Sequence, residues 1–219
     1  THAHGVEVDL SKEERAEVKK RFEDSPIELA GLGSAFEYHS PDPDELKKNI
    51  EGTKEYAILA ADVGAPGIKV RPNGLPDDVP VEKTLEQIGI SIRECGEFAK
   101  DYGIQIRVEV HGGGTSHVPY MRKIMDIADH DNVFVCWNSN SREVDENGSI
   151  KENFNLLKDF IQLGHMRDLF DKNYPWRELL KSLDAIGYEG FCLAEIPGST
   201  DPERVMKYYS ALWHAYLEL

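Results

Sequence analysis

Apolar residues recur along the chain with two alternating spacings, one typical of helices and one typical of strands. Segments with apolar residues three or four positions apart predict helices, and these are Ser11–Glu23, Asp42–Val63, Val81–Asp101, His117–Ala128, Lys151–Asp159, Trp176–Ala185 and Asp201–Leu219. Short apolar or alternating runs between them predict strands, which are Ile27–Gly33, Gly67–Arg71, Ile104–His111, Val133–Asn138, Phe160–Arg167 and Phe191–Ile196. We interpret His4–Val8 as the tail of one further strand. Strands that alternate with helices through short links predict right-handed crossovers and therefore a parallel sheet.

The predicted strands are apolar on one face and turn polar on the other near their carboxyl ends. Ile68 and Val70, for example, alternate with Lys69 and Arg71. The strands of an open doubly wound sheet are covered on both faces and are apolar throughout. In a barrel, inward residues at the carboxyl ends open into a wet mouth. The pattern favours an α/β fold of the (β/α)8 TIM barrel type over the open sheet.

The length of the chain suits one barrel domain over residues 1–219. If Phe191–Ile196 is the eighth strand, His4–Val8 corresponds to the second. We therefore expect an N-terminally incomplete barrel that lacks the first strand and part of the second. Because an open sheet edge exposes unpaired backbone groups, we expect upstream residues or another chain, as in a homo-oligomer, to cover it.

Composition restricts the partners and the compartment. A net charge of −15 argues against nucleic acid as the main partner, because proteins that bind it usually carry an excess of Lys and Arg. No apolar run reaches the roughly 18 residues of a membrane span, so no membrane partner is expected. Cys95, Cys136 and Cys192 form no CxxC pair, which indicates reduced thiols. No signal peptide is visible, and we expect a cytoplasmic protein.

Four predicted strands end in residues that bind metals. Glu109 and His111 point to the same face of one strand, directly before the glycine run Gly112–Gly114. The next three strands end in the side chains Asn138, His165 and Glu195. Because the carboxyl ends of barrel strands meet at one rim, Glu109, Asn138, His165 and Glu195 are expected to converge there. Two carboxylates, an imidazole and an amide suit Mn²⁺, Mg²⁺, Co²⁺ or Zn²⁺.

The same charged residues also allow a structural interpretation. Lys69, Arg71 and Arg167 could neutralise the two glutamates inside the barrel, as an ion network without catalytic function. The functional interpretation is favoured because four successive strands each offer a ligand-type residue at the same end. Chance would rarely produce this arrangement.

Four sequence blocks, in a fixed order along the chain, resemble one known family. The blocks VEVHGGGTSH, NVFVCWNSN, GHMRDLF and GYEGFCLAEIP resemble the xylose-isomerase-like TIM barrels of sugar phosphate isomerases and epimerases, over nearly the whole chain. The resemblance implies a divalent metal held by Glu109, Asn138, His165 and Glu195. Asn138 stands where Asp is more usual in that family, and its neutral amide is a weaker ligand.

The resemblance further implies a metal-dependent isomerase or epimerase that acts on a sugar or a sugar phosphate. Glu109 and Glu195, on nearly opposite strands, would be catalytic: one removes a proton next to a carbonyl and the other returns it. The side chains expected to bind the substrate are His111, Arg71, Arg167, Lys69, His4, Glu37 and His117. Tyr174 and Trp176 could stack on a sugar face, whereas Trp137 points outward and should pack against a helix.

Three other functions fit parts of the sequence. A lyase or hydratase acting on a keto-sugar or cyclitol would share the proton abstraction and then eliminate a leaving group. A catalytically degenerate barrel that only binds a sugar would be consistent with Asn138. A phosphodiesterase of this fold would need more metal ligands and a basic surface, which the charge of −15 disfavours.

Overall fold

The structure, a computed structural model, describes residues 5–218. Its strands are β1 (Leu32–Gly33), β2 (Gly67–Val70), β3 (Gln105–Glu109), β4 (Val133–Trp137), β5 (Ile161–Met166) and β6 (Phe191–Ala194). Its α-helices are α1 (Lys12–Glu23), α2 (Pro43–Val63), α3 (Val81–Lys100), α4 (Val118–Ala128), α5 (Lys151–Leu157), α6 (Trp176–Ala185) and α7 (Pro202–Leu217). Two short 3₁₀ segments are η1 (Ser141–Glu143) and η2 (Lys158–Phe160).

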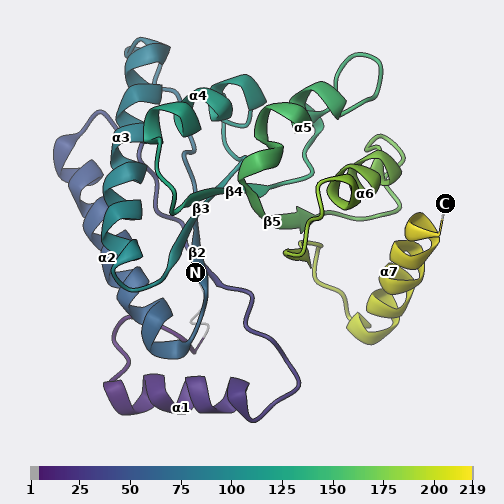
Figure 1. The fold of residues 1–219 in the computed structure, drawn as a ribbon, viewed down its shortest axis with the longest axis horizontal. Coiled ribbons are helices and arrows are strands. Elements are labelled where there is room, and N and C mark those ends of the chain that lie inside the picture. The colour runs from purple at the N-terminus through teal and green to yellow at the C-terminus, as the bar shows by residue number, and fades with distance from the viewer. Residues whose placement is uncertain (1–4, 219) are drawn as a thin grey trace.

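The strands form one parallel sheet in the order β1-β2-β3-β4-β5-β6. The order follows the sequence, so each helix carries the chain from one strand to its neighbour, as in a barrel. Figure 1 shows the strands at the centre, with α2, α3 and α4 on one side and α6 and α7 on the other. Within the described residues the sheet does not pair β6 with β1. The predicted (β/α)8-type architecture is confirmed as a curled part of a TIM barrel with six parallel strands.

The N-terminal strand predictions are the least accurate. None of the residues Gly5–Val8 is in a strand, so the proposed strand tail His4–Val8 is wrong over these residues, and His4 lies outside the described residues. Of the predicted strand Ile27–Gly33, only Leu32–Gly33 pairs. β1 has a neighbouring strand on one side only, and the carbonyl of Ala30 accepts a hydrogen bond from Arg107 Nη1 at 2.7 Å. The Arg107 side chain of β3 thus ties the residue before β1 to the rest of the sheet.

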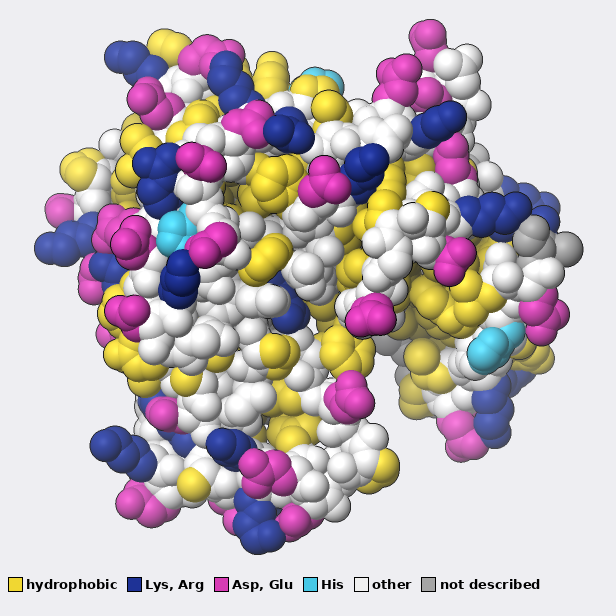
Figure 2. Space-filling view, viewed as in Figure 1, with side chains coloured by type: hydrophobic (Ala, Val, Ile, Leu, Met, Phe, Trp, Pro, Cys, Tyr) yellow, Lys and Arg dark blue, Asp and Glu magenta, His cyan; other side chains and the backbone are white. Residues whose placement is uncertain are grey.

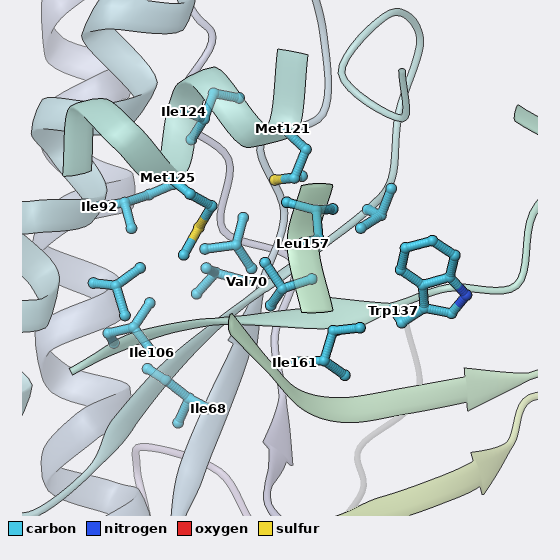
Figure 3. Packing of buried hydrophobic residues seen from close by; sticks show 14 of the residues in the cluster. Ile68, Val70, Ile92, Ile106, Met121, Ile124, Met125, Trp137, Leu157 and Ile161 are labelled. Carbon is cyan, nitrogen blue, oxygen red and sulfur yellow. The ribbon is translucent and has the colours of Figure 1, made fainter. Parts of the chain in front are cut away.

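The core lies between the outer face of the sheet and the helices. Ile68, Val70 and Ile106 are fully buried there, together with Ile92 of α3 and Ile124 of α4, as Figure 3 shows. Burying one such side chain contributes about 1.5–3 kcal/mol. Because side chains alternate along a strand, burial of these residues turns their polar neighbours toward the interior of the barrel.

Two glycines set how closely α3 approaches its neighbours. A Cβ at Gly89 would lie 2.6 Å from Ile127 Cγ2, and one at Gly96 would lie 2.6 Å from Val133 Cγ2. Both distances are too short for carbon atoms, so only glycine permits this packing. The contact fixes α3 against β4, the strand that ends at Asn138.

The outer surface is mixed in charge. Figure 2 shows acidic and basic side chains interspersed on the viewed face, with apolar side chains near α6 and α7. α7 has no buried residue, and Met206, Tyr208 and Leu212 on it are exposed. None of the helices in residues 5–218 combines the length and the apolar character needed to span a bilayer.

Candidate functional site

Three of the four predicted ligands meet at the carboxyl ends of the strands. Glu109 ends β3, His165 lies in β5, and Glu195 follows β6. One ligand atom from each lies within 4.8 Å of the other two. His165 Nδ1 is 3.4 Å from Glu109 Oε1 and 3.7 Å from Glu195 Oε2. Three residues far apart in the sequence therefore surround a common point.

The pairing of β5 and β6 explains this meeting. His165 lies opposite Leu193 in the register, and the Glu195 N–H continues the ladder by donating to the Met166 carbonyl at 2.8 Å. Glu195 is two residues beyond Leu193 and so points to the same face as His165. The parity predicted for these strands is therefore the one observed.

Asn138 directly follows β4 and is 1 % exposed. Its Oδ1 is buried without a hydrogen-bond partner, and so is Nδ1 of His165. Buried polar atoms of this kind are rare, because they lose water without compensation. A carboxylate pair, an imidazole nitrogen and an unsatisfied amide oxygen fit a divalent cation. The donor set and the unsatisfied atoms thus agree with a metal site.

Glu109 is held as a carboxylate. It is 3 % exposed, and Lys69 Nζ donates to its Oε2 at 2.8 Å. Burial alone would raise the pKa of Glu109, but the adjacent His165 and the charge and hydrogen bond of Lys69 outweigh burial and lower this pKa to about 2. Glu195, by contrast, has a 53 % exposed side chain at the rim. The two glutamates differ in their access to solvent.

A second polar cluster lies on the neighbouring strand ends. Glu37 Oε1 accepts hydrogen bonds from Arg71 Nη2 and Asn73 Nδ2, each at 2.7 Å. Asn73 Oδ1 lies 2.9 Å from His111 Nδ1, and His39 Nδ1 lies 3.8 Å from Glu37 Oε2. We call Glu37, His39, Arg71, Asn73 and His111 the rim network. It brings together three residues predicted to bind substrate, whereas the bridging Asn73 was not predicted.

The glycine run after β3 is explained by a close backbone approach. Gly112 forms an isolated parallel bridge with Asn73. Its φ is +101°, and a Cβ there would lie 1.7 Å from the Asn73 carbonyl oxygen. Gly113 has nothing within 4 Å of its Cβ position. The first glycine therefore lets the chain cross Asn73 closely, which holds His111 in the rim network.

The other predicted wall residues lie farther out. Arg167 follows β5 and is exposed, and His117 occupies the N-cap position of α4 with its ring 4.8 Å from that of Tyr120. Within residues 5–218, neither side chain forms a hydrogen bond or an ion pair with a candidate ligand. His4 lies outside the described residues.

A buried polar network behind the site was not predicted. Glu143 is 0 % exposed, and Tyr174 Oη donates to its Oε2 at 2.6 Å. Trp137 Nε1 donates in turn to Tyr174 Oη at 2.8 Å. Burial raises the pKa of Glu143 to about 8, although hydrogen bonds from Tyr174, Asn140 and Asn138 act in the opposite direction. Nothing in the sequence distinguishes Glu143 from the polar loop residues around it.

The aromatic predictions are corrected accordingly. Tyr174 and Trp176 are 5 % and 3 % exposed, so neither offers a stacking surface to a ligand. Trp137 points outward as predicted and packs edge-on against Phe154 of α5, with ring centroids 5.6 Å apart.

Comparison with known families agrees with the barrel fold. The sequence model of the xylose isomerase-like TIM barrel family matches residues 2–213. No curated protein gives a significant match.

Three solved structures illustrate the range of proteins with this fold. The apo 3-keto-D-glucoside 4-epimerase YcjR of E. coli has a TM-score of 0.77 and 13% identity, covering 93% of this chain and 85% of that one. The IolI protein with a bound zinc atom has a TM-score of 0.68 and 17% identity, with 95% and 82% covered. The probable 3-DHS dehydratase AsbF of Bacillus anthracis has a TM-score of 0.72 and 16% identity, with 91% and 81% covered. At these identities the structures show a common fold.

Proposed function

Because the chain belongs to the xylose isomerase-like TIM barrel family, we propose that it is a divalent-metal-dependent isomerase or epimerase of a sugar or sugar phosphate. The observation that carries this proposal is the convergence of Glu109, His165 and Glu195 within 4.8 Å. The buried, unsatisfied oxygen of Asn138, directly after β4, supports it. Two carboxylates at the mouth of a barrel, on strands three positions apart, suit proton transfer at two faces of one carbon. Sugar epimerases share the fold, which supports the same chemistry here.

In this proposal Glu109, Asn138, His165 and Glu195 hold the cation. A bound divalent metal would polarise the substrate carbonyl and so acidify the neighbouring C–H bond. Glu109, ionised through its contacts with Lys69 and His165, accepts that proton. Glu195, open to solvent, gives a proton to the opposite face in its acid form.

The site of proton return decides the product. Return to the same carbon inverts it, which is epimerisation. Return to the neighbouring carbon, with the hydroxyl proton passing to the former carbonyl oxygen, exchanges aldose and ketose. In the reverse direction Glu195 accepts the proton and Glu109 returns it.

The rim network is the proposed wall for substrate hydroxyl groups. His111 is oriented by Asn73, and Arg71 by Glu37. The Arg71 side chain is half-buried and Glu37 accepts from its Nη2 alone, so its remaining terminal N–H groups are proposed as donors to a ligand oxygen. Arg167, His117 and His4 are proposed as outer contacts, with Arg167 suited to a phosphate or carboxylate group.

Exchange of substrate protons with solvent tests the proposed chemistry. Mn²⁺-loaded protein in D₂O is incubated with a panel of ketoses, ketose phosphates and keto-glycosides, and deuterium incorporation is followed by NMR. We expect wild-type protein to exchange one α-proton, and Glu195→Gln to exchange it about 10²- to 10⁴-fold more slowly. Glu189→Gln, an exposed glutamate near the start of β6, is the control and should match wild type. Equal exchange in Glu195→Gln and wild type would contradict the two-base mechanism.

Calorimetry tests the metal separately. Mn²⁺, Co²⁺ and Zn²⁺ are titrated into chelator-treated protein, with His165→Ala as the ligand variant and His214→Ala, on the exposed side of α7, as the control. We expect His165→Ala alone to weaken binding. If wild-type protein bound none of the three ions, the ligand assignment would be wrong.

A dehydratase is the second candidate, because the probable dehydratase AsbF shares the fold. Abstraction of the same proton from a substrate with a β-hydroxyl group would expel water and leave an unsaturated ketone. A new ultraviolet absorption band in the same substrate panel would favour this function over epimerisation. Substrate binding without either exchange or absorption would favour a degenerate sugar-binding barrel.

A further inference from the structure

A buried carboxyl group contacts the backbone of the candidate ligand Asn138, outside the set of ligands. Glu143 of η1 is fully buried, and no cation forms an ion pair with it within residues 5–218. Its partners are all hydrogen-bond donors: Tyr174 Oη to Oε2, and Asn138 N–H and Asn140 Nδ2 to Oε1. The proposed proton transfer does not use this residue.

The segment that Glu143 binds is one that needs support. β4 ends at Trp137, and Ser139 then adopts a left-handed backbone with φ +50°. Such a conformation is strained for a residue other than glycine and persists only where the surroundings hold it. Glu143 Oε1 accepts from the Asn138 N–H at 3.3 Å and from Asn140 Nδ2 at 3.0 Å, on either side of Ser139.

The same contacts connect two strands that carry ligands. Asn140 Nδ2 also donates to the carbonyl of Val110 at 3.0 Å, directly after Glu109 at the end of β3. At the other end, Trp137 donates through Tyr174 to Glu143. Glu143 is thus the common acceptor for groups before and after Asn138.

We propose that Glu143 is a positioning residue that fixes the backbone around Asn138 and thereby aims the Asn138 amide oxygen at the metal. This inference rests on the proposed metal-dependent function. An apolar side chain at this position would leave the buried Asn138 N–H without a partner and release the left-handed turn at Ser139. A glutamine would keep an oxygen for Asn138 and Asn140, and its amide could donate to Tyr174 Oη.

Three variants separate positioning from folding. Glu143→Leu removes the acceptor, Glu143→Gln preserves it, and Tyr174→Phe removes the hydroxyl that donates to Glu143 and accepts from Trp137 Nε1. Glu152→Gln, an exposed glutamate at the start of α5, is the matched control. Each chelator-treated protein is titrated with Mn²⁺ by calorimetry, and with Co²⁺ while the visible absorption bands that report ligand geometry are recorded.

We expect Glu143→Leu to bind Mn²⁺ about 10- to 100-fold more weakly and to show an altered Co²⁺ spectrum. Glu143→Gln should restore both properties to near the wild-type values, and Tyr174→Phe should show a smaller loss in the same direction. Should Glu143→Leu fail to fold, Tyr174→Phe supplies the comparison.

The outcomes distinguish this inference from the proposed function. Wild-type affinity and an unchanged Co²⁺ spectrum in both Glu143→Leu and Tyr174→Phe would overturn the positioning role and leave the metal site intact. A change in melting temperature alone, without a change in affinity or spectrum, would also overturn it. Absence of metal binding in the wild type would overturn both proposals.

Discussion

The buried carboxylate of Glu109 makes stability of the metal-free protein depend on acid pH. The pKa of Glu109 is lowered from 4.5 to about 2 in the folded protein. A carboxyl group with a lower pKa in the folded state than in the unfolded state contributes stability above the unfolded pKa. This contribution is lost as the pH falls through the folded pKa.

The size of the effect follows from the two pKa values. At about 1.4 kcal/mol per pKa unit, the difference between 4.5 and about 2 contributes about 3 kcal/mol at neutral pH. About 2 kcal/mol of this is lost by pH 3. Glu109 is 3 % exposed, so solvent screens the interaction little.

Urea denaturation followed by tryptophan fluorescence measures this contribution. Wild type and Glu109→Gln are unfolded in the presence of a chelator at several values between pH 3 and pH 7. The free energy of unfolding of wild type minus that of Glu109→Gln should fall by about 2 kcal/mol from pH 7 to pH 3. The same difference for the exposed control Glu152→Gln should vary much less. A difference for Glu109→Gln that stayed constant across this range would refute the reasoning.

Three further perturbations test other parts of the structure. Lys69→Met leaves Glu109 without its cationic partner and should destabilise the metal-free protein by about 3–5 kcal/mol, measured by urea denaturation at pH 7; an unchanged midpoint would contradict the pairing. Because ionising the buried Glu143 opposes folding, wild type should lose up to about 5 kcal/mol of stability as the pH rises from 4.5 to about 8. Glu143→Gln should remove this loss. Parallel pH profiles of the two proteins would argue against this. Gly112→Ala should lower the melting temperature and cost more than 1 kcal/mol, whereas Gly113→Ala, with open space around its Cβ position, should have a smaller effect; equal effects would mean that the approach to Asn73 is not the constraint.

The parity of the central strands could be predicted because it depends only on alternation. In β2 and β3 the apolar positions face the helices, so Lys69 and Glu109 must face inward. The barrel architecture and the convergence of the ligands follow from this alternation and from the order of the elements. No long-range information is needed.

Features that depend on contacts distant in the sequence could not be predicted. Asn73 joins the rim network only because its backbone meets Gly112. Glu143 lies among polar residues that would suit a solvated loop, and its burial results from packing against Tyr174, 31 residues away. Tyr174 itself was expected to stack on a sugar, because its hydroxyl partner was not apparent from the sequence.

The candidate ligands and the rim network come largely from different parts of the chain. Glu109, Asn138, His165 and Glu195 belong to β3–β6 and the residues that follow them, whereas Glu37, His39, Arg71 and Asn73 precede β3. If the rim network contacts the substrate as proposed, genetic change before residue 74 would alter which molecule is accepted while the proposed proton-transfer groups stay in place. This separation gives a route by which descendants of one ancestral barrel acquire new preferences without rebuilding their chemistry.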